Sequence, residues 1–364
     1  MKPSYRRHNL PGQTGMTLIE LLVGMVLSLA AIVAIYQILS VWDGRRRTLT
    51  AGSNAQVSGT IGSFEVERDL KLAGMGFGNV IRNTIGCTVQ ATNSGLPTAN
   101  FAFQFLPILI TDGAGGAPDS LRVLYGNSAY SNSVQQLRSS TASAKVLESK
   151  AGYNAGDLAV VAGNTPRDCA LLEVTGPSVV PNEINHDTTA YTKFYPPSGT
   201  MTPSMNPAPG AATFTTGEMY NLGPGPQLTE WTVNPATTVL SRRNVLRQTA
   251  TFEVTEGIVN LQAQYGVDAN GDGLITATEW TITLPTNLYT ILAVRYALLS
   301  RSNQYEKDTE VTSTAPTWSA GAFTMRNLDG SLGVTTGVND WRRYRHKVFE
   351  SSVTLRNMLW GVPL

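Results

Sequence analysis

Charge and cysteine are both scarce in this chain of 364 residues. Charged residues make up 15% of it, and the 27 Lys and Arg nearly balance the 26 Asp and Glu, which leaves a net charge of +1. Such a balance creates no long-range field, so it excludes bulk electrostatic attraction to nucleic acid or to an anionic membrane. The two cysteines, Cys87 and Cys169, have neither a Cys-X-X-Cys spacing nor clustered histidines, which disfavours a zinc site. In an oxidising compartment we expect them to form one disulfide, and two buried free thiols are the alternative.

Patterns for catalysis are also missing. The three histidines, His8, His186 and His346, lie near no Ser or Cys in a recognisable frame, and Gly-X-Ser-X-Gly is absent. The glycine-rich run 112–116 is not followed by Lys-Ser or Lys-Thr, so it predicts a turn and not a phosphate loop. His186 beside Asp187 could orient a base, but its polar, loop-like surroundings favour a solvated surface position. The sequence therefore predicts no enzyme.

From Ile81 onward, short apolar or alternating runs separated by Gly, Pro, Asn and Ser clusters predict β-strands. This pattern is typical of an exported all-β or α+β domain. The prolines of 196–210 and the run 223–226 predict exposed loops. The basic run 342–347 could bind DNA or an acidic partner, but Tyr344 among alternating charges favours an edge strand. The predicted strands are Phe101–Ile110, Leu121–Tyr125, Asp157–Val161, Ala170–Val174, Trp231–Val233, Thr237–Arg242, Phe252–Val254 and Ile258–Tyr265.

A long apolar stretch runs from Gly15 to Trp42, and only Glu20 within it would be charged at neutral pH. It exceeds the roughly 20 residues that a helix needs to cross a bilayer. The short basic leader ends at Gly15, before the apolar run begins, so this segment would survive processing, unlike a secretory signal peptide. A carboxylate in a spanning helix costs about 2–3 kcal/mol at the bilayer centre and is usually retained for a partner. Basic residues flank the run on both sides, so positive charge does not set its orientation.

The helical pattern continues beyond Trp42 in an amphipathic form. Apolar residues recur at spacings of three and four, which predicts one face that packs on a sheet. Glycines within the segment weaken helix propensity by up to about 1 kcal/mol each, so this half needs such packing to persist. Glu67 and Lys71 form a favourable i, i+4 pair, and Gly74, Gly76 and Gly78 are expected to end the helix. The predicted packing residues are Val57, Ile61, Phe64, Val66, Leu70 and Ala73, and the glycines are Gly52, Gly59 and Gly62.

The hexapeptide Gly-Met-Thr-Leu-Ile-Glu at 15–20, followed by the long apolar helix, resembles the class III signal of type IV prepilins. The resemblance implies that a membrane peptidase cuts between Gly15 and Met16 and methylates the new amino terminus. Most family members have Phe as the first mature residue, and Met16 departs from that pattern. Glu20 becomes the fifth mature residue, and the resemblance implies that it pairs with the free amine of a neighbouring subunit's first residue. An ordinary membrane anchor is the alternative.

Three later passages resemble PilW-type minor pilins: Arg68–Gly76, Ile291–Ser302 and Arg342–Asn357, which contains Leu-Arg-Asn. The resemblance implies an α+β, pilin-like fold, in which a long amino-terminal helix packs on an antiparallel sheet enlarged by insertions. The expected organisation is a leader at 1–15, a transmembrane half-helix at 16–42, an amphipathic half-helix at 43–75 and a periplasmic or extracellular β-rich domain at 76–364. The middle of the chain, about 88–228, carries no recognisable motif.

The function implied by this resemblance is that of a minor pilin, stored in the inner membrane and assembled into the priming or tip complex of a type IV pilus at the cell surface. Its expected partners are the prepilin peptidase, other minor pilins and the major pilin. Two alternatives are a J-type pseudopilin of type II secretion and a membrane-anchored, calcium-dependent binding domain or adhesin. The adhesin would not need cleavage at Gly15.

A calcium loop is predicted at 268–279, Asp-Ala-Asn-Gly-Asp-Gly-Leu-Ile-Thr-Ala-Thr-Glu, which matches the complete EF-hand loop pattern. Strand-like residues flank it where an EF-hand would have helices, so we expect a calcium-stapled turn between two strands. The alternative is a metal-free Asp/Asn/Gly turn, which uses the same residues for backbone reasons. The match at the twelfth position favours calcium, with weak affinity of about 10⁻⁴–10⁻³ M. The expected ligands are Asp268, Asn270, Asp272, the Leu274 carbonyl, Thr276 and Glu279.

Overall fold

The computed structural model describes residues 15–77, 84–95, 98–129, 133–163, 168–195, 199–206, 213–247, 250–307 and 310–359, without the side chains of residues 48 and 359. The basic leader before Gly15, Gly78 and much of the proline-rich loop at 196–210 therefore lie outside the described residues. The chain divides into two compact units, Met1–Gly52 and Ser53–Leu364. Each unit is described separately below.

One long helix, α1 (Leu18–Leu72), accounts for both predicted helical halves. Thr17 caps its start, because its Oγ1 accepts a hydrogen bond from the Glu20 backbone N–H at 3.3 Å. The helix ends at Leu72, and Gly74 then adopts a positive φ of 79° that other residues avoid. In the last turn the predicted pair forms, with 2.6 Å between Lys71 Nζ and Glu67 Oε1. The predicted helix and its end are confirmed.

Three larger sheets occur within the described residues, and the fold is α+β. In spatial order, the nine-stranded sheet contains β2 (Asn100–Gln104), β1 (Thr88–Thr92), β8 (Cys169–Glu173), β7 (Leu158–Gly163), β13 (Gly217–Gly223), β5 (Gln135–Ser140), β6 (Ala144–Leu147), β10 (Glu183–Asn185) and β9 (Gly176–Pro177). The five-stranded sheet contains β16 (Phe252–Glu256), β15 (Val239–Asn244), β14 (Gln227–Asn234), β4 (Ser120–Tyr125) and β3 (Ile108–Thr111). The four-stranded sheet contains β18 (Trp280–Thr281), β17 (Ile258–Val267), β19 (Ile291–Arg301) and β22 (His346–Thr354).

Smaller elements complete the described chain. Two ribbons each pair two short strands, and several single-turn helices connect the larger elements. The ribbons are β11 (Tyr191–Thr192) with β12 (Thr200–Met201), and β20 (Thr317–Trp318) with β21 (Gly321–Ala322). The short helices are η1 (Ala114–Gly116), η2 (Leu288–Thr290), η3 (Gly337–Asn339), η4 (Trp341–Arg343) and α2 (Arg356–Leu359).

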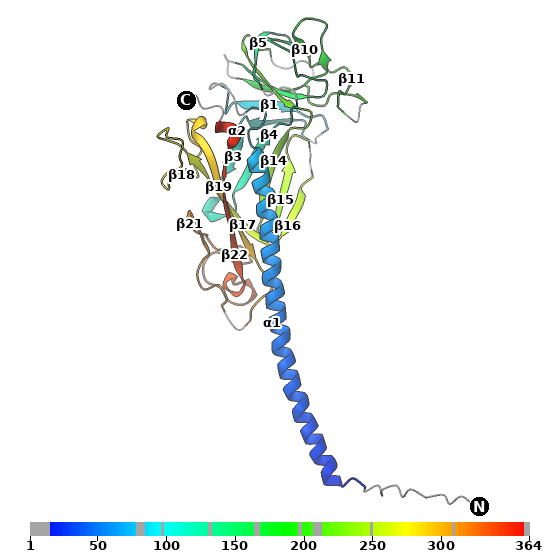
Figure 1. Cartoon of the computed structure of the whole chain (residues 1–364), viewed down its shortest axis with the longest axis vertical. Coiled ribbons are helices and arrows are strands. Elements are labelled where there is room, and N and C mark those ends of the chain that lie inside the picture. The colour runs from blue at the N-terminus through cyan, green and yellow to red at the C-terminus, as the bar shows by residue number, and fades with distance from the viewer. Residues whose placement is uncertain are drawn as a thin grey trace, which may run out of the picture. The chain divides into compact units, whose positions relative to one another are not determined.

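In the second unit, the carboxyl-terminal part of α1 lies between the four-stranded and five-stranded sheets (Figure 1). Its buried face consists mostly of small residues, and a Cβ at Gly62 would lie 2.9 Å from Leu240 Cδ2. A Cβ at Gly59 would overlap the Phe349 ring. The glycines thus allow the sheets to approach the helix closely. The buried positions are Ala55, Gly59, Gly62, Val66, Asp69, Leu70 and Ala73.

This face corrects part of the predicted packing. Val66, Leu70 and Ala73 are buried as expected, but Val57, Ile61 and Phe64 are 54%, 44% and 65% exposed. The prediction followed the larger apolar side chains, whereas the sheets contact the row that contains the glycines. The three exposed residues form an outward apolar row on the same helix, at spacings of four and three.

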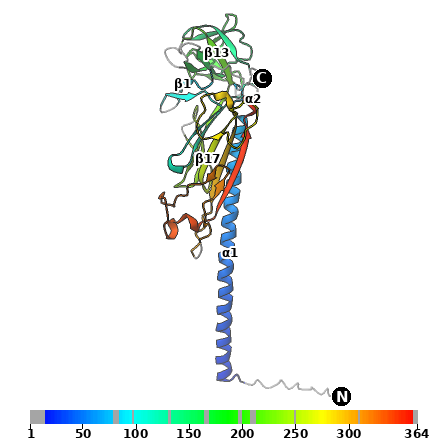
Figure 2. The ribbon, with the colours of Figure 1, turned by 90° about the vertical axis from the view of Figure 1, so that its left-hand side faces the viewer.

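The nine-stranded sheet and the four-stranded sheet occupy separate regions of the second unit (Figure 2). Their strand pairs are antiparallel except β1 with β8, which are parallel. The predicted strand Phe101–Ile110 is wrong as a single element, because it divides at Pro107 into β2 and β3 of different sheets. The other predicted strands are present with shifted bounds. Met205, within the predicted proline-rich surface loop, is buried.

Candidate functional site

The predicted processing and assembly residues lie at the start of α1 in the first unit. Gly15 and Met16 precede the helix and are exposed, and Glu20 lies in its first turn. The Glu20 carboxylate makes no hydrogen bond or ion pair with any residue that the structure describes. The large apolar side chains between Leu18 and Trp42 are 46–80% exposed. Such a surface needs a bilayer or other apolar helices to cover it.

The helix is long and apolar enough to cross a membrane, judged by its length and composition. Signal sequences and membrane anchors both have such an apolar helix near the amino terminus. The described geometry therefore offers an anchor candidate whose one ionisable group, Glu20, is available to a partner.

In the second unit, a buried carboxylate that the sequence reasoning missed fixes α1 to the five-stranded sheet. Asp69 Oδ2 accepts a hydrogen bond from Trp231 Nε1 at 3.1 Å, and Asp69 Oδ1 accepts one from the Tyr125 hydroxyl at 3.2 Å. Burial raises the pKa of Asp69, and the bond from Trp231 opposes that rise. Trp231 and Asp69 are almost wholly buried. Only the sheet's fold brings these groups together, since Asp69 precedes Trp231 by 162 residues.

Hydroxyl groups hold the other side of the same helix segment against the four-stranded sheet. The Ser300 hydroxyl donates to the Ala55 carbonyl at 2.9 Å, and the Tyr296 hydroxyl donates to the Ser63 carbonyl at 2.8 Å. After the helix, Asn357 Nδ2 donates to the Ala73 carbonyl at 2.9 Å. Two of these contacts come from β19, whose residues are mostly buried. The helix segment is therefore held on two sides by specific hydrogen bonds.

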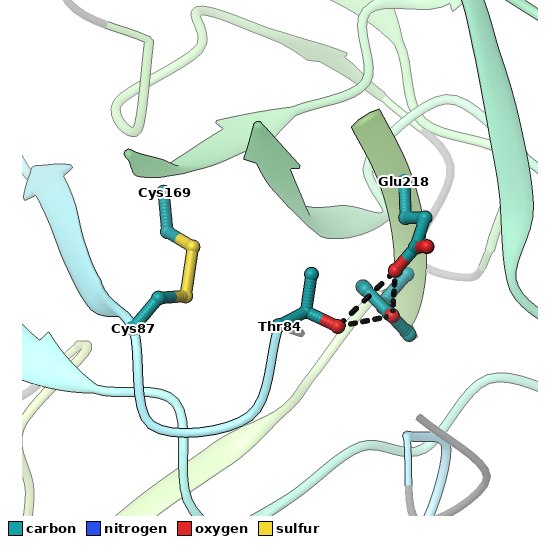
Figure 3. The surroundings of a disulfide bond; sticks show 5 residues. Thr84, Cys87, Cys169 and Glu218 are labelled. Carbon is teal, nitrogen blue, oxygen red and sulfur yellow. Dashed lines mark hydrogen bonds between the residues drawn. A yellow bond between two sulfur atoms is a disulfide. The ribbon is translucent and has the colours of Figure 1, made fainter. Parts of the chain in front are cut away.

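The predicted disulfide between Cys87 and Cys169 is confirmed, with Cα atoms 6.2 Å apart (Figure 3). It closes a loop across 82 residues and ties the start of β1 to the start of β8. Nearby, the Thr84 hydroxyl donates to the buried Glu218 carboxylate at 3.1 Å (Figure 3). Tyr220 also donates to Glu218, at 2.7 Å. A covalent link and a polar network therefore hold β1, β8 and β13 together.

The predicted calcium loop lies between paired strands, as expected, because β17 pairs with β18 across it. Asp268 accepts hydrogen bonds from the backbone N–H groups of Gly271, Asp272 and Gly273 at 2.7, 3.1 and 2.9 Å. Glu279 Oε2 accepts from the Thr276 N–H and hydroxyl, both at 2.8 Å. These bonds lower the pKa of Glu279.

The other predicted ligands belong to the same turn. Asn270 Nδ2 donates to Asp272 Oδ2 at 2.9 Å, while Asp272 Oδ1 accepts from the Leu274 N–H at 2.8 Å. Within the described ranges, no three His, Cys, Asp or Glu side chains lie together in a group that could hold a metal ion. Hydrogen bonds therefore satisfy the loop carboxylates in this structure, and calcium binding stays a prediction.

The predicted surface position of His186 is wrong, since its side chain is only 2% exposed. His186 Nε2 lies 2.9 Å from Lys145 Nζ, and Lys145 also donates to the Thr141 carbonyl at 2.7 Å. Burial lowers the pKa of Lys145 to about 8, and burial together with Lys145 lowers the pKa of His186 to about 3. Both side chains are buried within the nine-stranded sheet's region, where β6 pairs with β10. At neutral pH His186 is therefore uncharged while Lys145 stays largely protonated, and the pair is a structural contact between an ammonium donor and a neutral imidazole.

Two of the four Lys and Arg side chains in the basic run near the carboxyl terminus pair with acidic side chains of the chain itself. Arg342 Nη2 lies 2.8 Å from Asp340 Oδ2, and Arg345 Nε lies 3.5 Å from Glu306 Oε1. The predicted edge strand is present as β22, but it begins at His346, so Tyr344 precedes it. These internal pairs reduce the charge that this run offers to an external acidic partner.

Comparison with known proteins gives one match. The model of the family described as Type IV Pilus-assembly protein W matches residues 232–357. This range covers β15 to β22 and the first half of α2, and it includes the β19 residues that contact α1 but no strand of the nine-stranded sheet. No curated protein and no solved structure matches the chain. Through residues 232–357, the chain is therefore similar to the PilW family of type IV pilus-assembly proteins.

Proposed function

We propose that this protein is a minor pilin that assembles, with other minor pilins, into the priming or tip complex that initiates a type IV pilus. The observation that carries the proposal is the combination of the family match with an exposed apolar helix that begins two residues after Met16. A pilin-like fold and insertion into the inner membrane before assembly belong to the same proposal. The bulk of the chain would then be periplasmic.

The proposed assembly step depends on burial of the helix surface. Packing the apolar side chains into a helix bundle also moves Glu20 into an apolar environment. An unpaired carboxylate is costly there, so assembly is favourable only if Glu20 gains a compensating partner. A free amine at the neighbouring subunit's first residue, created by cleavage between Gly15 and Met16, has the complementary charge. Glu20 would therefore set the axial register between subunits.

A matched pair of variants tests this role. Glu20→Ala is expected to reduce the crosslinked pilus subunits that copurify with the protein, and also the number of surface pili. Asp43→Ala is the control, because Asp43 is an exposed carboxylate of the same helix that pairs with Arg47 at 2.8 Å. Equal copurification and equal pilus numbers in wild type, Glu20→Ala and Asp43→Ala would contradict the proposal. Loss of type II secretion with normal pili in a deletion strain would favour a pseudopilin instead.

Calcium binding at 268–279 is a second, independent proposal, supported by the complete loop sequence and its position between paired strands. Six oxygen-bearing groups are available, which is within the range that calcium requires. Calorimetry of the full chain in detergent micelles should show weak calcium binding that Asp272→Ala abolishes. Identical heats from the two proteins would remove the site.

A further inference from the structure

One strand at the margin of the four-stranded sheet, β22, has an edge that no described strand pairs with (red in Figure 2). On its other side it pairs with β19 over nine residues without a register shift. The other outer strands of the three larger sheets have two to five residues each. Proteins usually keep outer strands short or interrupt them with bulges or proline, because a long regular edge is a template for another strand. β22 has neither a bulge nor a proline.

Alternate residues of β22 direct their backbone groups away from β19. At the two ends of the pairing, the Arg345 carbonyl accepts a backbone hydrogen bond from the β19 side, and the Leu355 N–H donates one to it, both at 2.8 Å. In an antiparallel pair only every second residue bonds to the partner strand, so the odd-numbered residues of β22 bond to β19. The backbone groups of Val348, Glu350 and Ser352 therefore point to the open edge. In the described part of the chain these groups have no hydrogen-bond partner.

The two faces of β22 have different neighbours. On one face, the Phe349 ring packs against α1, and the Ser351 hydroxyl donates to Glu67 Oε2 of the same helix at 3.4 Å. Glu350 lies on the opposite face, where it accepts hydrogen bonds from the Ser319 N–H at 3.1 and 3.2 Å. Glu350 is exposed and forms no ion pair with any residue that the structure describes. A strand added at the edge would therefore meet an apolar helix side and an acidic outer side.

An exposed aromatic side chain of α1 lies toward the open edge. At 3.6 residues per turn, Phe64 lies about 60° around the helix from Glu67 and about 100° from Glu65. Glu67 faces β22, whereas Glu65 accepts from Arg242 of the five-stranded sheet at 3.3 Å. Phe64 is 65% exposed and lies between these two directions, nearer to β22. It is positioned to cover the helix-side residues of an added strand.

We propose that the open edge of β22 binds an extended segment of another pilus subunit as an additional strand. This inference rests on the proposed function. The segment would bond through its backbone to Val348, Glu350 and Ser352, which supplies affinity without a specific sequence. Alternate side chains of the segment would supply specificity, with apolar residues toward Phe64 and a Lys or Arg opposite Glu350.

A second copy of this chain does not meet these requirements when the two β22 strands pair antiparallel. Side chains opposite each other in such a pair lie on the same face of the sheet. Lys347 lies on the helix face, where it donates to Gln56, so it cannot lie opposite Glu350 of another copy. The other side chains on the face of Glu350 include no Lys or Arg; they are His346, Val348, Ser352 and Thr354. The charge pattern therefore favours a different chain.

The first test compares two variants of one residue, with the full chain in cells and in detergent micelles. Ser352→Pro removes an outward N–H and places a proline ring at the edge, without removing a hydrogen bond to β19. Ser352→Ala keeps the N–H and is the matched control. Both variants should remain folded in thermal unfolding. The crosslinked pilus subunits that copurify should fall by on the order of tenfold with Ser352→Pro and stay at the wild-type amount with Ser352→Ala.

A second pair of variants reverses a charge and leaves the backbone intact. Glu350→Lys should also reduce the copurified subunits, because it places like charges opposite each other in the added strand. Glu253→Lys is the control, since Glu253 is an exposed carboxylate of the outer strand β16, and it should have no effect. If Ser352→Pro fails to fold, this pair decides the matter, and equal copurification by both charge variants would then overturn the proposal.

A photocrosslinking side chain introduced at Ser352 identifies what occupies the edge. Mass spectrometry should find it linked to an extended segment of another pilus subunit. Crosslinks between two copies of this chain would instead assign the edge to self-pairing and overturn the proposal. Folded Ser352→Pro protein that copurifies with as many subunits as Ser352→Ala would overturn the edge inference alone. A wild-type chain that copurifies with no pilus subunit would overturn the proposed function as well.

Discussion

The nine-stranded sheet and the two sheets around α1 differ in what they bury. The former buries several ionisable groups, including Lys145, Asp157 and Glu218, and has a separate hydrophobic cluster on one of its faces. The latter form a continuous apolar core with the helix, which the other face of the nine-stranded sheet joins, and Asp69 is the helix's one fully buried carboxylate among the described residues. The family match covers most of the helix-binding strands but none of the nine-stranded sheet. The matched range therefore includes the β19 contacts that hold the helix on the side of the four-stranded sheet, whereas Tyr125 and Trp231, which bind Asp69 on the other side, lie outside it.

The largest expected effect concerns the nine-stranded sheet. Replacing both cysteines, Cys87→Ser with Cys169→Ser, removes a link across 82 residues. The chain-entropy account predicts a loss of up to about 4–5 kcal/mol in the free energy of unfolding. Urea unfolding followed by fluorescence measures it. A loss below about 1 kcal/mol would mean that the polar network around Glu218 holds these strands without the covalent link.

On the helix side, Asp69→Ala is expected to lower the free energy of unfolding by about 2–4 kcal/mol, because it leaves the buried donor of Trp231 and the half-buried hydroxyl of Tyr125 without their acceptor. Asp69→Asn is the matched control, since its carbonyl oxygen still accepts from Trp231, and a smaller loss of about 1 kcal/mol is expected. Thermal unfolding of the two variants gives the comparison. Equal stability of Asp69→Ala and wild type would show that this contact does not hold the helix.

The buried bases predict a pH dependence for the nine-stranded sheet. The pKa of His186 is about 3 in the folded chain, against an ordinary histidine pKa of about 6.5, so the unfolded chain binds the additional proton between these values. Stability therefore falls as pH drops below 6.5, by up to about 2 kcal/mol at pH 5. His186→Gln should remove that share of the pH dependence, measured by urea unfolding at pH 7 and pH 5. An unchanged difference between the two pH values would refute the assignment.

The smallest expected effect tests the close approach of sheet and helix. Gly59→Ala increases helix propensity but forces the Phe349 ring to move. We therefore expect the free energy of unfolding to fall by about 1 kcal/mol. Gly52→Ala has no atom within 4 Å of the new Cβ and should stabilise by up to about 1 kcal/mol. Differential scanning calorimetry compares them. Stabilisation of both variants to the same extent would mean that Gly59 does not serve close packing.

Local sequence patterns predicted the elements that depend mainly on residues close together in the sequence. The apolar run and its continuation gave α1, and the cysteine count gave the disulfide. The buried face of α1 was partly wrong, since a pattern of large apolar residues gives no weight to Gly59 and Gly62. β13 was missed, because Gly-Glu-Met-Tyr-Asn-Leu-Gly mixes polar and apolar residues although every residue is buried.

The remaining features depend on contacts distant in sequence. His186 follows Lys145 by 41 residues, so its apparent partner in the sequence was the adjacent Asp187. Arg301 and Arg326 line the same cavity only because the loop 324–330 folds over the sheet. The Arg326 guanidinium donates to the carbonyl of Gly115, which lies 211 residues earlier in the sequence. No spacing rule reports such pairs, because sheet topology determines them.

The mass of the mature chain from cells tests the central claim most directly. Processing as a minor pilin predicts a chain that begins at Met16 with an N-methylated amino terminus, and that copurifies with pilus subunits. Gly15→Val, which replaces the small residue before the proposed cut with a larger one, should leave the leader attached and reduce the number of surface pili. An intact leader and an unmethylated amino terminus on the wild-type chain would contradict the account.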